Sequence, residues 1–377
     1  MREFEHKNAY FDRLAANPRL RWMGQNTNHL PLPPQVRAAM LDAIDSDAIR
    51  GYAPPLGMEA LRRGILDDLG LAGASVMVTD GAIEGLYHAC RTLVGPGDEF
   101  ITTDPGWRWP VRFAAAAGAR VVEIPIYDAA AGYKLTPGQL AGAVGPRTRL
   151  VYLIDPNNPL GVCYTREEIE AFAAICREAG AYLIHDCTYR HFAFDHTLAA
   201  HFYPQRTLTT YSFSKWLGLA GLRIGAIVAD GEVIEALASA PPNNLGSNVL
   251  SQRAALAGLA VKSSWFPGVQ ATQRANQAMI RDAVAGIAGL TLPVYPSSGN
   301  FVIIDVTASG VAPEALVEAS SRRDFMIRQG GYHTERFAHR FVKVSTTVPA
   351  QWMREFCELL PELVETARGI NAVDAKY

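Results

Sequence analysis

The stretch SFSKWLGLAGLRIG, residues 212–225, contains a lysine in an unusual setting. It overlaps the end of the apolar run TLTTYSF (207–213) and leads into a second run, RIGAIVA (223–229). Both runs have the length and the β-branched and aromatic content of buried strands. Lys215 therefore stands directly after a strand, within the pattern S-x-S-K-x-x-G-L-x-G-L-R. A solvated surface lysine is the alternative interpretation, and so specific a context argues against it.

Further strands are predicted upstream of this stretch. They are SVMVT (75–79), EFITT (99–103), RLVYLI (149–154) and AYLIH (181–185). Helical patterns fill the gaps between them, and the clearest runs from about Arg166 to Ala179, where Thr165 and Glu168 form a capping box. This alternation predicts an α/β fold, with a large domain built on a mostly parallel central sheet flanked by helices.

The length of 377 residues exceeds that of a single hydrophobic core and indicates two units. After about residue 270 the pattern changes to a long helix, a strand within PSSGNFVIIDV (296–306), a strand FVKVSTT (341–347) and a final helix from Gln351. We therefore predict a large domain over 46–270 and a smaller α+β domain over 271–377. Residues 1–45, with the Pro-rich HLPLPP (29–34), are expected to form an arm that packs on the smaller domain.

Composition excludes several classes of partner. The formal net charge is -2, with no dense basic run, so nucleic acid is not an expected partner. The five cysteines are scattered and the histidines lack ligand spacing, which predicts neither disulfides nor a metal site. No stretch approaches the roughly 18 apolar residues of a membrane span, and the N-terminus lacks a signal-peptide core. We expect a cytoplasmic protein that does not bind membranes.

Polar residues follow the predicted strands at the points where the strands end. In open α/β sheets, ligands bind beyond the carboxyl ends of the strands, so these residues are candidates for one site. They are Asp80-Gly81-Ala82, Trp107, Asn157-Asn158-Pro159, Asp186 with Tyr189, and Ser212 to Lys215.

Three motifs together resemble those of a known family. SFSKWLGLAGLRIG resembles the lysine signature of fold-type I pyridoxal 5′-phosphate (PLP) enzymes, class I/II aminotransferases, and most of all their histidinol-phosphate aminotransferase branch. DPNNPLG (155–161) resembles the family's N-P-N-N-P-x-G, with Asp155 in place of the first Asn, and HDCTY (185–189) resembles its D-x-x-Y. The resemblance runs from about Asn26 to the C-terminal helix and implies the aspartate aminotransferase fold.

The resemblance implies a role for each residue around the cofactor ring. Lys215 would hold the cofactor as a Schiff base and, once displaced by the substrate amine, would act as the base. Asp186 would pair with the protonated ring nitrogen, because a buried carboxylate needs a cationic partner. Asn158 and Tyr189 would hydrogen-bond the ring hydroxyl oxygen, and Trp107 would stack on the ring face.

A phosphate group needs several hydrogen-bond donors, preferably with a helix N-terminus and an arginine among them. The resemblance assigns this role to a helix start and to three residues of the lysine segment: Gly81, Ala82, Ile83, Ser212, Ser214 and Arg223. Tyr52 matches a family tyrosine that reaches the phosphate of the neighbouring subunit. A homodimer with a shared active site is therefore expected.

The substrate half of the site departs from the family. Its members usually grip the α-carboxylate with an arginine in a C-terminal strand, whereas FVKVSTT carries Lys343 at that position. One interpretation is that Lys343 binds the α-carboxylate less rigidly than an arginine would, and another is that Arg328 or Arg340 binds it in place of Lys343. A third is that the acidic group of the substrate is not an ordinary α-carboxylate. The alternative to all three is that Lys343 is a solvated residue at the strand edge. Asn28, in NTNHLPLPP (26–34), is a further candidate for contact with substrate.

The expected function is PLP-dependent transamination between an amino acid and a 2-oxo acid by a ping-pong cycle. A lyase, decarboxylase or oxidase on the same fold is the alternative, because fold and cofactor do not choose the bond that breaks. A non-catalytic sensor domain of a transcription regulator has less support. Such proteins carry a DNA-binding domain before this unit, whereas here the expected arm begins within about the first 25 residues.

Overall fold

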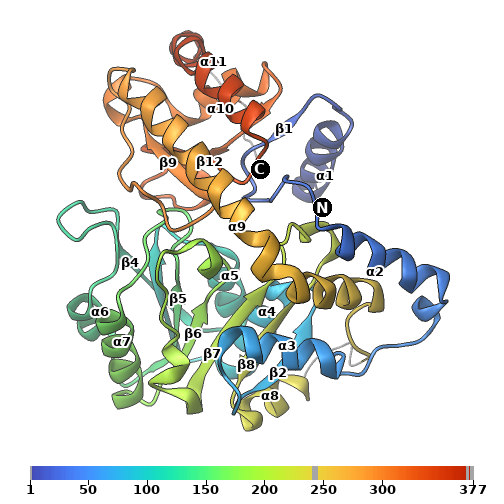
Figure 1. The fold of residues 1–377 in the computed structure, drawn as a ribbon. Helices are drawn as coiled ribbons and strands as arrows, with labels where there is room; N and C mark the ends of the chain where they lie inside the picture. The colour runs from blue at the N-terminus through green and yellow to red at the C-terminus, as the bar shows by residue number, and fades with distance from the viewer. Residues whose placement is uncertain (1, 240–244, 371–372, 374–377) are drawn as a thin grey trace.

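A seven-stranded sheet forms the centre of the larger part of the molecule (Figure 1). The structure is a computed structural model that describes residues 2–239, 245–370 and 373. The strand order is β2-β8-β7-β6-β5-β3-β4, and β8 is antiparallel to both neighbours whereas the other pairs are parallel. The strands are β2 (Ser75–Thr79), β3 (Glu99–Asp104), β4 (Arg120–Pro125), β5 (Thr148–Ile154), β6 (Tyr182–Asp186), β7 (Thr207–Ser212) and β8 (Gly225–Ala229). The predicted, mostly parallel sheet is confirmed.

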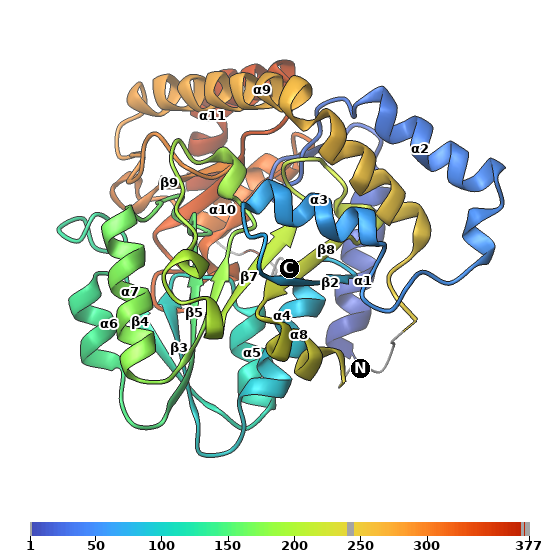
Figure 2. The same cartoon turned by 60° about the horizontal axis from the view of Figure 1, so that its bottom comes forward.

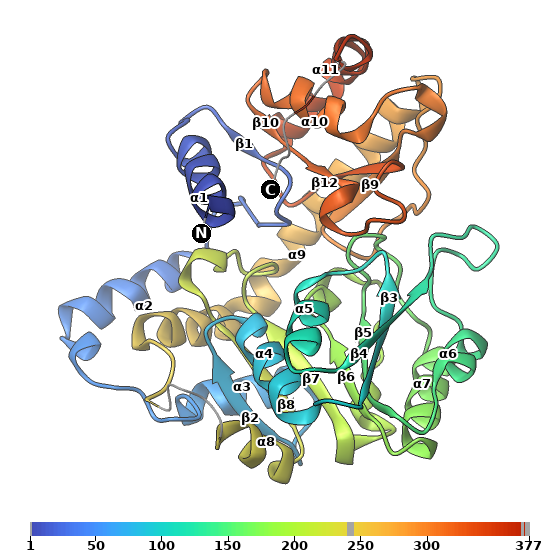
Figure 3. The same cartoon turned by 180° about the vertical axis from the view of Figure 1, so that it is seen from behind.

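Helices cover both faces of this sheet, as Figures 1 and 3 show from opposite sides and Figure 2 shows with the bottom of the molecule turned forward. One face carries α4 (Ala82–Leu93), α5 (Trp109–Ala116) and α8 (Gly231–Ala238), and the other carries α3 (Glu59–Leu69), α6 (Pro137–Ala143) and α7 (Arg166–Glu178). Helix α7 begins with the predicted capping box, in which Thr165 and Glu168 each accept the backbone N–H of the other. Because both faces are covered, the strands other than the edge strand β4 are buried nearly throughout.

The smaller unit contains a three-stranded antiparallel sheet, β11 (Arg328–Gln329), β12 (Phe341–Ser345) and β9 (Phe301–Asp305), in that order. Helices α10 (Pro313–Ser321) and α11 (Ala350–Arg368) share one apolar core with it. The N-terminal segment joins this unit, because β1 (Arg21–Trp22) pairs with β10 (Phe325–Met326) and Met23 is part of the same core. Before it comes α1 (Arg2–Ala15).

Helix α9 (Val249–Ala285) extends from the larger unit to the smaller one, as Figure 1 shows. It packs against α2 (Pro34–Asp45) and α3 on the larger side and against α11 on the smaller side. It begins about 20 residues before the long helix that we predicted and runs through Pro267. The helix therefore passes through residues 270 and 271 without a break. We keep the division into 1–45, 46–270 and 271–377 as a proposal.

Within the described ranges, every helix is too short or too polar to cross a lipid bilayer.

Candidate active site

A cavity of about 310 Å³ lies where the carboxyl ends of the parallel strands face the small sheet. Ile154, Asp186 and Ser212 line it from the ends of β5, β6 and β7, while Arg328 and Lys343 line it from β11 and β12. Most residues predicted for the site meet there. Those that line the cavity are Ala82, Ile83, Trp107, Asn158, Asp186, Tyr189, Ser212, Ser214, Lys215, Arg223 and Lys343.

Lys215 follows β7 and extends its side chain into this cavity. Its Nζ donates a hydrogen bond to the backbone carbonyl of Gln25, 2.9 Å away. Desolvation and, to a smaller extent, the positive charge of Arg223 lower the pKa of Lys215 to about 8, although Asp186 opposes the shift. At pH 7 about a tenth of the amine is therefore uncharged, far more than for an ordinary lysine, and this is the state that a nucleophile or a base requires.

Asp186 is the last residue of β6, and its carboxylate is 3% exposed. Oδ2 accepts from the Tyr152 hydroxyl at 2.6 Å, and Oδ1 accepts from the hydroxyls of Thr210 and Thr188, both at 2.7 Å. All these donors are neutral, and within the described part of the chain no cationic side chain forms an ion pair with it. A buried carboxylate that faces a cavity in this way suits a cationic ligand group.

Asn158 and Tyr189 are joined by a residue that the motifs did not single out. Asn26 Nδ2 donates to the Tyr189 hydroxyl at 2.9 Å and lies 3.4 Å from Asn158 Oδ1. Asn26 is buried and has a left-handed backbone (φ 54°), and among the described residues its own Oδ1 has no hydrogen-bond partner. Burial raises the pKa of Tyr189 above its usual range, so this hydroxyl stays protonated and able to donate.

Asn28, the arm residue that we expected to contact substrate, does not line the cavity. Its Nδ2 donates to the backbone carbonyl of Trp216, and its Oδ1 accepts from the backbone N–H of Leu30, both at 3.0 Å. Both ends of the amide are thus used to fix the turn of the arm. Gln25, Asn26 and Thr27 line the cavity instead.

The start of α4 and the lysine segment form a cup at one end of the cavity. Gly81 is the N-cap of α4 with φ 81°, and an added Cβ there would lie 2.2 Å from Arg223 Nη2. Only glycine allows the guanidinium to come so close to the helix start. Arg223 is held by the carbonyls of Ala220 and Asp80, while Ser212 Oγ accepts from Ser214 N–H.

Tyr52 lies apart from the cavity, and 83% of it is exposed. Trp107, which follows β3 as predicted, is partly buried against the core beneath α4 and α5 and presents part of its surface to the cavity. Within one chain, Trp107 therefore reaches the cavity and Tyr52 does not.

The substrate half of the cavity contains two basic residues side by side. Arg328 and Lys343 are cross-strand partners in β11 and β12 and are only 3% and 2% exposed. Lys343 Nζ donates to Asn158 Oδ1 at 3.1 Å. Arg340 instead faces Asp305 and the ring of Tyr127, outside the cavity. Lys343 is thus not a solvated edge residue, and of the two arginines considered, Arg328 is the one in the site.

The residues present fit PLP. The carboxylate of Asp186 faces the cavity with neutral partners only, and the cup at Gly81 and Arg223 combines a helix start with a guanidinium, the donor set that a phosphate requires. Asn158 and Tyr189 offer hydrogen bonds between these two ends.

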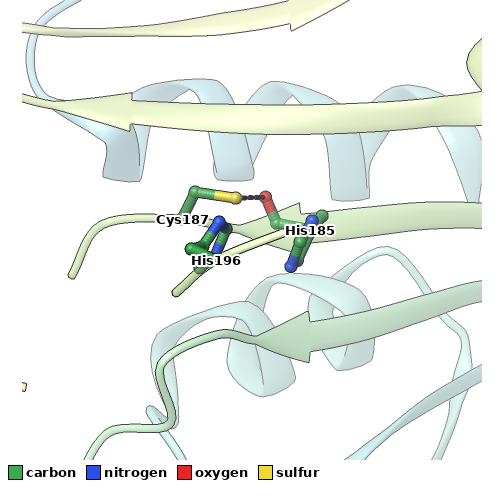
Figure 4. A group of neighbouring side chains, drawn as sticks. All are labelled: His185, Cys187 and His196. Carbon is green, nitrogen blue, oxygen red and sulfur yellow. Dashed lines mark hydrogen bonds between the residues drawn. The ribbon is translucent and has the colours of Figure 1, made fainter. Parts of the chain in front are cut away.

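A second polar cluster lies at the end of β6, where His185, Cys187 and His196 have possible metal-ligand atoms within 4.8 Å of one another (Figure 4). Hydrogen bonds explain why these side chains lie together. His185 Nδ1 accepts from the backbone N–H of Ala199, so in the neutral ring Nε2 carries the proton and faces Asp155 Oδ2 at 3.2 Å. His196 faces the same oxygen at 3.2 Å, and burial raises the pKa of Cys187, which keeps its thiol protonated. We interpret the cluster as support for Asp155 rather than as a metal site.

Comparison with known proteins agrees with this geometry. A sequence model of the family "Aminotransferase class I and II" matches residues 19–360. The chain is 30% identical over 314 residues to histidinol-phosphate aminotransferase 2 of Ralstonia nicotianae, covering 82% of this chain and 80% of that one. It is 29% identical to aspartate/prephenate aminotransferase of Thermus thermophilus, covering 75% of each. The solved structure of N-succinyldiaminopimelate aminotransferase from Mycobacterium tuberculosis superposes with a TM-score of 0.84 at 25% identity, covering 94% and 96% of the two chains.

The predicted family, fold and cofactor are therefore confirmed, and the enzymatic activity is transamination. The chain belongs to the class I and II aminotransferases, enzymes that depend on PLP.

Proposed function

We propose that Lys215 is the cofactor lysine, and that the other cavity residues hold PLP as the family motifs imply. Asp186 would bind the ring nitrogen, Asn158 and Tyr189 the ring hydroxyl oxygen, and Trp107 one ring face. The phosphate would lie in the cup formed by Gly81, Ala82, Ile83, Ser212, Ser214 and Arg223. PLP, when bound, supplies an electron sink for the bonds at the substrate Cα.

The remaining chemistry belongs to the chain. Lys215 Nζ takes the proton from the substrate Cα and carries it within the site, a role supported by the lowered pKa of this amine and by its position in the cavity. The Asp186 carboxylate keeps the ring nitrogen protonated, because Tyr152, Thr188 and Thr210 fix its orientation and leave its charge unbalanced. Asn26 orients Asn158 and Tyr189 by bridging them.

The substrate is proposed to be an amino acid whose anionic group is held by Arg328 and Lys343. One observation carries this proposal: four basic residues line the cavity, Lys215, Arg223, Arg328 and Lys343, against the single carboxylate of Asp186. The cofactor engages the first two, which leaves Arg328 and Lys343 for the substrate. An anionic substrate group would complement this excess of basic side chains.

Arg328→Met is expected to raise KM about 100-fold for donors with an anionic group, because a buried charge pair with the substrate is lost, and to change kcat less. The measurement is a panel of amino acids and 2-oxo acids, followed by the half-reaction spectrum. Arg340→Met is the matched control, since Arg340 belongs to the same unit but faces Asp305. Equal KM values for the two variants would contradict the assignment.

We also propose a homodimer in which Tyr52 serves the partner's site. Exposed large apolar side chains gather on α2 and the segment after it, at Leu41, Ile44, Ile49 and Tyr52. Helix α2 buries Val36 and Ala43 but leaves Leu41 and Ile44 on an outer face, about half exposed. Large apolar side chains left exposed within one segment of the chain are typical of an interaction site.

Ile44→Asp is expected to weaken the dimer at least about tenfold, because a carboxylate would be desolvated in the interface. Light scattering with size-exclusion chromatography would report the mass, and apoprotein titration would report a parallel loss of PLP affinity as the partner's Tyr52 is withdrawn. Phe194→Asp is the matched control, since Phe194 is also exposed (61%) but lies after β6. A wild-type monomer at micromolar concentration would refute the shared site.

A cytoplasmic location is part of the proposal. All five cysteines are free thiols, which is usual for proteins of reducing compartments.

A further inference from the structure

Lys343 lies in the middle strand of the small sheet, in a setting that does not favour a charge. Its cross-strand neighbours are Arg328 in β11 and Ile303 in β9. The Nζ atom donates to the neutral Asn158 Oδ1 at 3.1 Å and lies 5.3 Å from the centre of the Phe301 ring. Among the described residues no carboxylate forms an ion pair with it. Within the described part of the chain its polar and aromatic partners are an amide oxygen and a ring face, and neither balances a full charge.

The charged side chains nearest Lys343 are positive: Arg328 faces it from β11, and Lys215, which is free to carry a charge until it binds the cofactor, faces it from the segment after β7. His333, in the turn after β11, stays neutral because burial lowers its pKa well below its usual value. Burial, followed by the charges of Arg328 and Lys215, lowers the pKa of Lys343 well below its usual value. The remaining titratable residues that line the cavity are Arg223, Tyr189, Tyr332 and Asp186. Asp186 already accepts hydrogen bonds from the hydroxyls of Tyr152 in β5 and Thr210 in β7.

We infer that Lys343 is uncharged in the free holoenzyme near neutral pH and takes up one proton from solvent when an anionic substrate binds. The inference rests on the proposed substrate site. The new ammonium then pairs with the substrate anion beside Arg328, whose guanidinium is charged throughout. Family members usually have arginine at this position, which cannot titrate; lysine makes binding depend on a proton.

Binding of an anionic substrate should weaken as the pH rises. The protonated amine pairs with the anion, so the complex holds one proton more than the free enzyme above the pKa of Lys343. Affinity for the anionic substrate should then fall about tenfold for each unit of rising pH, since one proton is taken up per binding event. Lys343→Arg removes this dependence because the guanidinium needs no proton.

The decisive experiment needs no substrate. The visible absorption of PLP bound to the enzyme changes with pH, and the midpoint of that change responds to nearby charge. With an uncharged Lys343, Lys343→Met leaves the midpoint unchanged, and Lys343→Arg lowers it by about one pH unit because a positive charge is added. If Lys343 is charged, the pattern is reversed: Lys343→Met raises the midpoint and Lys343→Arg leaves it unchanged. That result overturns the inference. Lys134→Met, a lysine paired with Glu168 outside the cavity, is the matched control.

A second measurement uses the wild type alone, in case the variants do not bind PLP. KM for an anionic donor is followed from pH 6 to 9 together with kcat. A KM that rises about tenfold per unit above a midpoint while kcat holds supports the inference. A KM that stays flat over that range overturns it. The presence of the visible absorption band tests the proposal that the cavity binds PLP. The pH midpoint of that band tests the charge of Lys343, so the cofactor proposal and the Lys343 inference can fail separately.

Discussion

Lys215→Ala is expected to lower kcat by about four orders of magnitude and to abolish covalent capture of PLP. The residue supplies both the amine that binds the cofactor and the base that moves the Cα proton, and no neighbouring group can replace both functions. The side chain makes one hydrogen bond, to the Gln25 carbonyl, so the fold should survive its loss. The measurements are single-turnover kinetics and peptide mapping after borohydride reduction.

The second lysine in the cavity makes peptide mapping a sharp test. Reduction should label the peptide that contains Lys215 in the wild type and leave the variant unlabelled, although Lys343 lines the same cavity. A label on Lys343 in the wild type would refute the assignment. Lys343→Met should keep the label on Lys215, and added methylamine should restore part of the proton transfer in Lys215→Ala, which a purely structural loss would not allow.

Much of the large unit could be predicted because its strands are apolar and end in polar residues. Such runs are recognisable when they are buried on both faces, as β5 and β6 are. The edge strand β4 was not predicted. Its sequence, RVVEIP, carries Arg120, Glu123 and Pro125 and is only partly buried, since an edge strand has one side without a neighbour.

The start of α9 was also not predicted from the sequence. Pro267 and two glycines interrupt its helical pattern, and these residues disfavour helix interiors. Packing explains one glycine: a Cβ at Gly258 would lie 2.2 Å from a methyl group of Leu217 in the lysine segment. The tertiary contact, which local propensity cannot reveal, outweighs the cost of the glycine.

The cofactor residues were easier to find than the substrate residues for a physical reason. Lys215, Asp186 and Asn158 belong to contiguous motifs at strand ends, where position follows from local sequence. Asn26 and Arg328 come from an irregular arm and a two-residue strand, so only the tertiary fold brings them to the site. The motif N-T-N contained the signal, but the choice between Asn26 and Asn28 depended on the left-handed backbone at Asn26.

Asp186→Asn should lower kcat/KM roughly 10²- to 10³-fold, because the amide cannot balance a protonated ring nitrogen. The change preserves shape. The amide oxygen can take the place of Oδ1, which accepts from Thr188 and Thr210, and the amide nitrogen can donate to the Tyr152 hydroxyl once that group turns. Stability should therefore change little, and the loss should appear in the chemical step, measured as the single-turnover rate.

Asp68→Asn is the matched control, because Asp68 is a partly buried carboxylate outside the cavity. Burial alone would raise the pKa of Asp68, but His191, Lys262 and Arg190 outweigh it and hold the pKa below its usual range. Its stabilising effect is thus present above the unfolded-state pKa of about 4 and lost as the pH falls toward the lower folded-state value. Near neutral pH the variant should lose about 3 kcal/mol in the free energy of unfolding, since Lys262 and Arg190 are left without their carboxylate, while kcat holds. If Asp186→Asn instead lost stability and kept its rate, Asp186 would be a structural residue and its proposed role would be wrong.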